Sequence, residues 1–157
     1  MVSNEEISVN KRNGRGKESL NIEKIHSMVG FATEGITGVS ASHVEMNSGI
    51  QFFDGVSTAD IQQILIKSAN DLITLENPNY QYVAARLLLF QLRKQLFHRL
   101  WDHPKFIDHI KTLIDKGLYD KDILVNYDES EIDRMGMWID HERDYNFTYA
   151  GLRQVMD

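Results

Sequence analysis

The first hundred residues carry apolar side chains at the three- and four-residue spacing of amphipathic helices. We expect a first helix to begin after Asn21, a residue type that caps helix N-termini, and to end near Gly35. A second helix is expected to begin near Ser42, because Ser42 and Glu45 have the spacing of a capping box, and to run to about Phe53.

Two further helices are predicted before residue 102, with a break between them at Pro78. The third helix begins after Ser57 or Thr58, and its apolar positions continue to Ile73. Pro78 disfavours helical conformation in the residue before it, so the fourth helix follows the proline and ends near Trp101. Four helices in succession predict one compact unit.

A β-hairpin is expected ahead of these helices, in residues 5–20. Ile7 and Val9 alternate with polar neighbours, and Asn13 followed by Gly14 is a turn dipeptide typical of hairpins. The turn region is basic and carries Lys11, Arg12, Arg15 and Lys17.

From Pro104 onward the helical pattern restarts in shorter segments. One helix contains Phe106 and Ile114 and stops at Gly117. Further helical segments are expected over residues 120–127, 130–138 and 147–156. The last one has no stop signal, and we expect the chain to continue into a longer protein.

The composition argues against several classes of function. The net charge of −6 argues against nonspecific binding to nucleic acid or to anionic membranes, both of which require a basic surface. No apolar run approaches the roughly 18 residues that a membrane-spanning helix needs. The N-terminal residues are acidic and lack a secretory pattern, so we expect a cytoplasmic protein without nucleic acid or membrane partners.

The chain has no cysteine and six histidines. Without cysteine there can be no disulfide, zinc ribbon, iron–sulfur cluster or thiol catalysis within it. His98, His103 and His109 do not have the four-residue helical spacing of a ligand pair, and we expect no metal site.

The basic hairpin is the strongest local candidate for chemistry. Lys11 and Arg12 beside a helix N-terminus would form a phosphate site, because helix amides and cationic side chains converge on one anion. Glu18 and Asn21 could instead read the donors and acceptors of a base edge, with Val9 and Ile25 as its apolar walls. The alternative is a solvated hairpin with ordinary surface charges.

Seven motifs stand in order along the chain. They are Val9-x-Lys11-Arg12-x-Gly14, Asn21-x-x-Lys24-Ile25-His26, Asp54-Gly55-Val56-x-Thr58-x-Asp60-Ile61, Pro78-x-Tyr80-Gln81-Tyr82-Val83-Ala84-Ala85-Arg86 with Leu92-Arg93-Lys94, Phe106-Ile107-Asp108-His109, Gly117-x-Tyr119-Asp120, and His141-Glu142-Arg143-Asp144-x-x-Phe147-x-Tyr149. In this order they resemble the N-terminal region of the large subunit of class I ribonucleotide reductases, including phage-type enzymes.

The resemblance implies a mainly α (α+β) fold in two parts. Residues 1–101 would form an ATP-cone, a four-helix bundle capped by a small three-stranded sheet. Residues 102–157 would form a helical segment that leads to a catalytic barrel lying beyond this chain. In this family the cone is the overall-activity site, at which ATP activates the enzyme and dATP can inhibit it.

The resemblance also assigns roles to individual residues. The residues implied to hold phosphates are Lys11, Arg12, Thr58 and Lys94. Those implied at the base are Val9, Glu18, Asn21 and Ile25, and Lys24 is implied near the sugar or the phosphates. Gln62 is implied as a further nucleotide contact, and Asp60 and Gln91 stand at positions tied to the allosteric switch.

Two departures from the family pattern bear on regulation. Gln62 and Gln91 stand where the family often has histidine, and glutamine cannot become cationic near neutral pH. The segment 13–20 also holds about one extra residue. Both departures weaken the expectation of dATP inhibition more than that of nucleotide binding. The alternative is a degenerate cone that binds no nucleotide and serves as a structural and subunit-interaction domain.

The expected effector is ATP or dATP with Mg²⁺, and no redox cofactor is expected. The expected partners are the remainder of the large subunit and the small radical-generating subunit. In this family the reducing and radical cysteines lie beyond this stretch, so the chain is expected not to reduce ribonucleotides by itself. No phosphate-binding Gly-x-x-x-x-Gly-Lys-Ser/Thr loop is present, which disfavours independent nucleotide hydrolysis.

Overall fold

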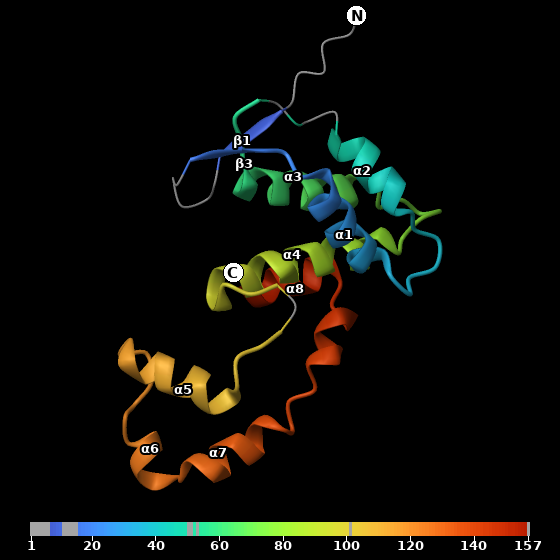
Figure 1. Ribbon diagram of the computed structural model, residues 1–157. Coiled ribbons are helices and arrows are strands. Elements are labelled where there is room, and N and C mark those ends of the chain that lie inside the picture. Colours follow the sequence, from blue (N-terminus) through green and yellow to red (C-terminus); the bar gives the residue numbers. More distant parts are fainter. Residues whose placement is uncertain (1–6, 11–15, 50–51, 53, 101, 157) are drawn as a thin grey trace, which may run out of the picture. The chain divides into compact units, whose positions relative to one another are not determined.

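The computed structural model describes residues 7–10, 16–49, 52, 54–100 and 102–156. It consists of two compact units (Figure 1). The first comprises Met1–Gln91 together with Tyr145–Asp157, and the second comprises Leu92–Asp144. The predicted boundary at residue 101 stays a prediction.

A three-stranded sheet opens the first unit. Its strands are β1 (Ser8–Asn10), β2 (Lys17–Ser19) and β3 (Val56–Ser57), in the order β2-β1-β3. The antiparallel pairing of β1 with β2 confirms the predicted hairpin, whereas its turn at Asn13 and Gly14 lies outside the described residues. The parallel pairing of β3 with β1 has no counterpart in the sequence pattern, because two residues are too short to show alternation.

Side chains hold β3 in place beside β1. The backbone amide and the hydroxyl of Ser8 both donate to Oδ1 of Asp54, at 3.0 and 2.6 Å. Asn10 Nδ2 donates to the carbonyl of Gly55 at 2.7 Å, and the amide of Gly55 donates to the carbonyl of Ser8 at 2.8 Å. Gly55 has a φ of 83°, which glycine adopts without the steric cost of a side chain.

The helices of the first unit are α1 (Ile22–Thr33), α2 (Ala41–Gly49), α3 (Thr58–Asp71), α8 (Tyr149–Met156) and the beginning of α4 (Tyr80–Phe97). Asn21 caps α1 as predicted, since its Oδ1 accepts from the amide of Lys24 at 3.0 Å. The predicted cap at Ser42 is wrong, because α2 already begins at Ala41 and Ser40 Oγ accepts from the amide of His43.

The core of the first unit is continuous and apolar. Its largest fully buried apolar side chains are Val29, Val44, Val56, Leu65, Val83, Leu87 and Phe90. Burying an aliphatic or phenyl side chain of this size contributes about 1.5–3 kcal/mol each. These side chains come from α1, α2, β3, α3 and α4, so the core joins the small sheet to the helices.

The half-buried Arg86 ties further parts of the first unit together. Nη1 of Arg86 donates to the carbonyl of Glu34 at 2.7 Å, just past the end of α1. The guanidinium of Arg86 also lies over the ring of Tyr145, 5.4 Å from its centroid. A cation over an aromatic face is attracted by the ring quadrupole, so this contact helps to place the residues before α8.

The second unit contains α5 (Phe106–Asp115), α6 (Ile123–Asn126), α7 (Glu129–Gly136) and the start of a 3₁₀ helix, η1 (His141–Asn146). Its core is small: Ile107, Ile110 and Ile132 are buried, with four partly buried apolar side chains packed against them. A Cβ at Gly136 would lie 2.5 Å from Cβ of Phe106, so α7 approaches α5 so closely that only glycine fits.

Residues near the start and near the end of the second unit contact each other. The buried Arg93 donates from Nη2 to Oδ2 of Asp144 at 3.1 Å. Beside this pair the rings of His103 and His141 stack at a centroid distance of 3.6 Å. This cluster fixes the start of the unit against its end.

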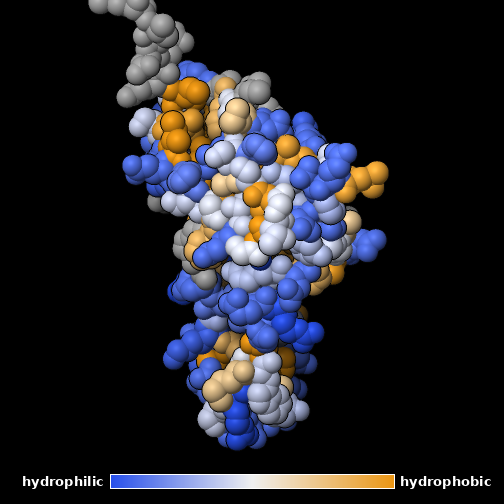
Figure 2. Space-filling model, turned by 90° about the vertical axis from the view of Figure 1, so that its right-hand side faces the viewer, coloured by the Kyte–Doolittle hydropathy of each residue, from blue (hydrophilic) through white to orange (hydrophobic). Residues whose placement is uncertain are grey.

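The fold class is confirmed as mainly α with one small sheet. The later predicted helices are present as α5, α6, α7 and α8, with ends shifted by a few residues, as is usual for helix termini. No helix among the described residues has the length and apolarity to cross a membrane. On the face drawn in Figure 2, hydrophilic side chains cover most of the surface and hydrophobic ones gather in separate patches.

Candidate functional site

The floor of the candidate site is apolar and belongs to the first unit. Val9 on β1 and Ile25 on α1 are both buried. Glu18 on β2 stands opposite Val9 in the strand register and is half-buried. The strand register therefore brings Val9 and the Glu18 carboxylate together, while Ile25 follows in the first turn of α1.

The start of α1 supplies the next polar groups. Oδ1 of Asn21 caps the helix, and its Nδ2 group is the donor that the side chain would offer to a base. Lys24 is exposed in the first turn of the helix. Its ammonium group would be available to a phosphate or a sugar outside the helix start.

The start of α3 lies at the opposite end of the sheet. Thr58 is the first residue of this helix and follows Ser57, which pairs with Asn10 of β1. Asp60 forms a capping box with Ser57: the amide of Asp60 donates to Ser57 Oγ at 3.1 Å, and the amide of Ser57 donates to Asp60 Oδ2 at 3.4 Å. The Ser57 hydroxyl also donates to this Oδ2, at 2.6 Å. A phosphate at this helix start would compete with the Asp60 carboxylate for the same positive end of the helix dipole.

Two glutamines lie inside the helices below the sheet. Gln62 is buried, and its Nε2 donates to the carbonyl of Leu87 at 3.0 Å, so its amide joins α3 to α4. Gln91 is 9% exposed, and its Oε1 is buried without a hydrogen-bond partner among the described residues. Leaving such an acceptor unpaired costs about 1–3 kcal/mol, which a donor on a ligand would recover.

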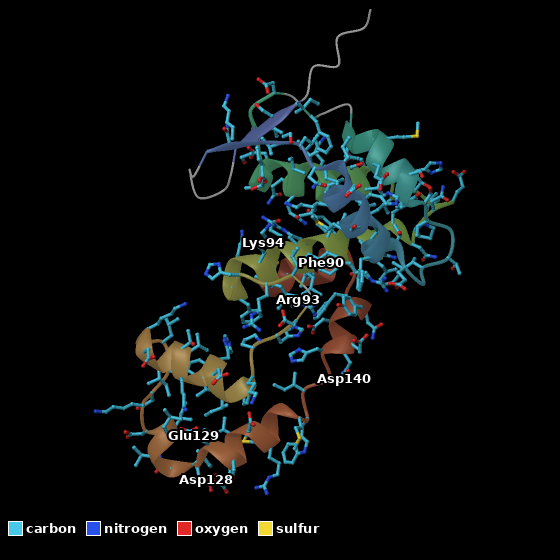
Figure 3. The ribbon with its side chains drawn as sticks, in the orientation of Figure 1. Phe90, Arg93, Lys94, Asp128, Glu129 and Asp140 are labelled. Carbon is cyan, nitrogen blue, oxygen red and sulfur yellow. The ribbon has the colours of Figure 1, made fainter. Side chains whose placement is uncertain are left out.

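The remaining predicted phosphate ligands are only partly placed. Lys94 lies on α4, three residues after Gln91, in the portion of the helix that is grouped with the second unit (Figure 3). Lys11 and Arg12 lie outside the described residues. They follow Asn10, which stands at the end of the sheet where α3 begins.

Sequence reasoning missed the residues that attach the sheet to α3, namely Ser8, Asn10 and Asp54. The hydroxyl of Ser8, and then its amide, lower the pKa of Asp54 by hydrogen bonding to the carboxylate. A carboxylate directly before a glycine, as in Asp54-Gly55, signals a turn but does not say which strand the side chain will bind.

The second unit contains a cluster with metal-ligating side chains, formed by His103, His141 and Asp144. Their ligand atoms lie within 4.8 Å of one another. The two imidazole planes are nearly parallel, at 10°, and a metal ion binds an imidazole nitrogen in the ring plane, so both rings cannot point at one ion in this arrangement. Arg93 also forms an ion pair with the carboxylate of Asp144. The cluster therefore fits an ion pair beside two stacked imidazole rings better than a metal site.

The comparisons with known proteins agree with the predicted resemblance. Residues 7–95 match the family described as the ATP cone domain. The chain is 44% identical over 149 residues to the ribonucleoside-diphosphate reductase subunit alpha of Buchnera aphidicola from Acyrthosiphon pisum, which covers 95% of this chain and 19% of that protein. It is 43% identical over 152 residues to subunit alpha of ribonucleoside-diphosphate reductase 1 from Escherichia coli K12, covering 97% and 20%.

A phage relative is similar to nearly the same extent. The subunit alpha of the enzyme from Enterobacteria phage T4 is 40% identical over 151 residues, covering 96% of this chain and 20% of that protein. The chain thus spans about a fifth of the length of these relatives. The cone match covers more than half of the chain, and the chain therefore belongs to the ATP cone domain family, in a form similar to the N-terminal region of ribonucleoside-diphosphate reductase alpha subunits.

Proposed function

We propose that the cone binds ATP or dATP with Mg²⁺ and acts as the allosteric activity domain of a ribonucleotide reductase large subunit. The observation that carries this proposal is the match of residues 7–95 to the ATP cone domain. The similarity to reductase alpha subunits, which extends over at least 95% of the chain, supports the link to that enzyme.

The base would lie against the sheet. Val9 and Ile25 would form the apolar backing of the base site, and Glu18 and Asn21 would offer an acceptor and a donor to the polar edge of an adenine ring. A site that hydrogen-bonds a base edge rejects bases lacking the matching groups, because its own polar atoms would then stay unpaired.

The phosphates would lie toward the start of α3. Thr58 offers a hydroxyl at the helix N-terminus, and the cations proposed to complete the site are Lys11, Arg12, Lys24 and Lys94. Several cations are needed because a triphosphate carries several negative charges, and each charge-assisted contact contributes about 1.5–3 kcal/mol. Mg²⁺ would neutralise part of the remaining charge.

Regulation requires that the effector bind two assembly states with different affinity. We therefore expect nucleotide binding to change how the cone associates with the remainder of the large subunit. It should likewise change how the large subunit associates with the small radical-generating subunit. The whole subunit would reduce ribonucleotides, with the chemistry carried by the part beyond this chain. Gln62 and Gln91, as neutral groups, favour a cone whose response to dATP is weaker than its binding of nucleotide; Asp60 would transmit the response through the start of α3.

A cone that serves only as a structural and interaction domain is the second candidate. The observation in its favour is Gln62, whose amide group is already bound to the carbonyl of Leu87 inside the helix pair. A side chain held in this way contributes to packing whether or not a nucleotide is present.

Calorimetric titration of the chain with ATP and with dATP, each with Mg²⁺, separates the two candidates. We expect saturable binding of at least one nucleotide, weakened about tenfold or more by Lys94→Ala, which removes a charge-assisted contact. Lys116→Ala removes the same charge from the end of α5 and should leave the affinity unchanged. A folded chain that takes up neither nucleotide would leave only the structural domain.

A further inference from the structure

Asp54 is an exposed carboxylate that links two segments far apart in the chain. It lies two residues before β3, and its Oδ1 accepts from the amide of Ser8 at 3.0 Å and from the hydroxyl of Ser8 at 2.6 Å. These hydrogen bonds lower the pKa of Asp54, so the carboxylate is ionised near neutral pH. A charged acceptor that receives two donors from one residue fixes that residue more tightly than one neutral hydrogen bond does.

Two further hydrogen bonds continue this link along β1. The amide of Gly55 donates to the carbonyl of Ser8 at 2.8 Å, and Asn10 Nδ2 donates to the carbonyl of Gly55 at 2.7 Å. The parallel register of β1 and β3 sets Asn10 opposite Ser57. Because β3 has only two residues, its own ladder is too short to specify this register, and the side chains supply the rest. We refer to Ser8, Asn10, Asp54 and Gly55 as the strand clamp.

The strand clamp places the start of α3 relative to the end of β1. Ser57 is both the last residue of β3 and the N-cap of α3, so Thr58 begins the helix directly after the strand (Figure 1). Asn10 is the last residue of β1, and the chain continues from it to Lys11 and Arg12. The clamp therefore fixes the two points from which the predicted phosphate ligands start, namely the hydroxyl at the helix start and the two cations after the strand.

Asp54 is itself unsuited to bind a phosphate. Its carboxylate and the oxygens of a triphosphate are both negatively charged acceptors, so direct contact would be repulsive. The clamp is also separate from the packing of the strands, because Val9 and Val56, which pair in the register, are 2% and 0% exposed and hold β1 and β3 in the core. Loss of the clamp should therefore disturb the alignment of the two segments more than it destabilises the fold.

We propose that Asp54 is a positioning residue of the nucleotide site, which holds the start of α3 in register with β1 so that ligands from both segments reach the same triphosphate. This inference rests on the proposed nucleotide binding, and it adds that the affinity depends on a side chain that does not touch the nucleotide. Ligands that are already aligned lose less conformational freedom on binding, and this is the contribution of the clamp to affinity.

Calorimetric titration of the complete chain with ATP and Mg²⁺ tests this role through two substitutions at one position. Asp54→Ala removes the acceptor of both Ser8 donors and should weaken ATP binding about tenfold. Asp54→Asn keeps an oxygen that accepts both donors and should bind ATP within about twofold of the original chain. Both substitutions remove the same negative charge, so a direct effect of that charge on the triphosphate would instead tighten binding equally in both.

Ser8→Ala is a second probe of the same contact, because it removes the hydroxyl donor without changing a charge. It should weaken binding less than Asp54→Ala does, and it should add nothing in the double variant, since both act through one contact. Asp71→Ala is the matched control: it removes a carboxylate at the other end of α3 and should leave the affinity unchanged. Thermal unfolding midpoints measured without nucleotide show which variants are folded at the temperature of the titration.

The outcomes separate this role from the proposed function on which it rests. The positioning role is overturned if Asp54→Ala binds ATP as tightly as the original chain, or if Asp54→Asn binds as weakly as Asp54→Ala. If Asp54→Ala does not fold, Ser8→Ala decides, and an unchanged affinity overturns the role. An original chain that binds neither ATP nor dATP overturns the proposed function together with this role, whereas a chain that binds ATP regardless of residue 54 overturns the positioning role alone.

Discussion

The two units bury their apolar side chains to different degrees. The largest fully buried side chains among the described residues all belong to the first unit. In the second unit the best-buried apolar side chain, Ile132, keeps 3% of its surface exposed, and Ile107 and Ile110 keep 7%. The first unit thus has the better-buried core, whereas the second combines a smaller core with the ion pair between Arg93 and Asp144.

Their exposed surfaces differ in the same direction. Among the described residues, exposed large apolar side chains of the first unit are adjacent in sequence only at Val155 and Met156, while in the second unit Met137, Trp138 and Ile139 are exposed in succession. A domain that binds a small effector must be stable in its absence, whereas a connecting segment can be stabilised by the body to which it connects. The difference between the units is what the proposed division into a nucleotide-binding cone and a connecting segment would produce.

The largest effect is expected from Phe90→Ala. Phe90 is fully buried and packs edge-on against Phe31 at a centroid distance of 6.4 Å, so its loss should lower the free energy of unfolding by about 3–5 kcal/mol. Ile132→Ala in the smaller core should cost about 2 kcal/mol. Urea unfolding measures both values, and an equal or larger loss for Ile132→Ala would remove the distinction between the cores.

The contact between α5 and α7 is tested by Gly136→Ala. A methyl group there would overlap Phe106, and overpacking of this kind costs about 1–3 kcal/mol. Gly30→Ala is the matched control within α1, where no atom lies within 4 Å of the added Cβ, and it should stabilise the protein by about 0.5–1 kcal/mol. Opposite signs of the two changes in thermal unfolding are the expected result; the same sign would contradict the packing described.

The start of α3 is tested by Ser57→Ala, which removes the capping oxygen. We expect a loss of about 1 kcal/mol in unfolding free energy, because the amide of Asp60 loses its acceptor. Ser130→Ala on α7 keeps that helix's own cap at Asp128 and serves as the comparison. If Ser57→Ala leaves stability unchanged, the cap does not hold the helix start at the candidate site.

The smallest effect is expected when the pH changes the protonation of His103, which lies beside the ion pair of Arg93 with Asp144. Burial, and then the nearby Arg93 and His141, lower the pKa of His103 below the ordinary histidine value. The unfolded chain therefore binds more protons between the two pKa values, and the stability of the second unit should fall as the pH drops through the ordinary value of about 6.5. His103→Gln should flatten this dependence in hydrogen-exchange measurements on α5 and α7; an unchanged dependence would contradict it.

Much of the helical architecture could be predicted from spacing and caps. Asn21 and Ser57 were recognisable as caps because their side chains bond amides only three residues away, a local relation that a sequence displays. Ser42 was chosen wrongly because Ser40 has the same chemistry two residues earlier, and only the backbone decides between them.

The candidate site was less predictable, since it depends on pairings between distant residues. The attachment of Asp54 to Ser8 spans 46 positions and leaves no periodic signal. The fixing of Gln62 to Leu87 and the unpaired oxygen of Gln91 likewise appear only when α3 and α4 are placed together. The resemblance supplied the site residues, whereas their packing had to come from the structure.

Hydrogen exchange with and without ATP and Mg²⁺ tests the central claim most directly, because it reports on both units at once. We predict that ATP slows exchange in β1, in the first turn of α1 and at the start of α3, while α5 and α7 exchange as before. Absence of any protection in the first unit, or protection confined to residues 106–136, would contradict the assignment of nucleotide sensing to the cone.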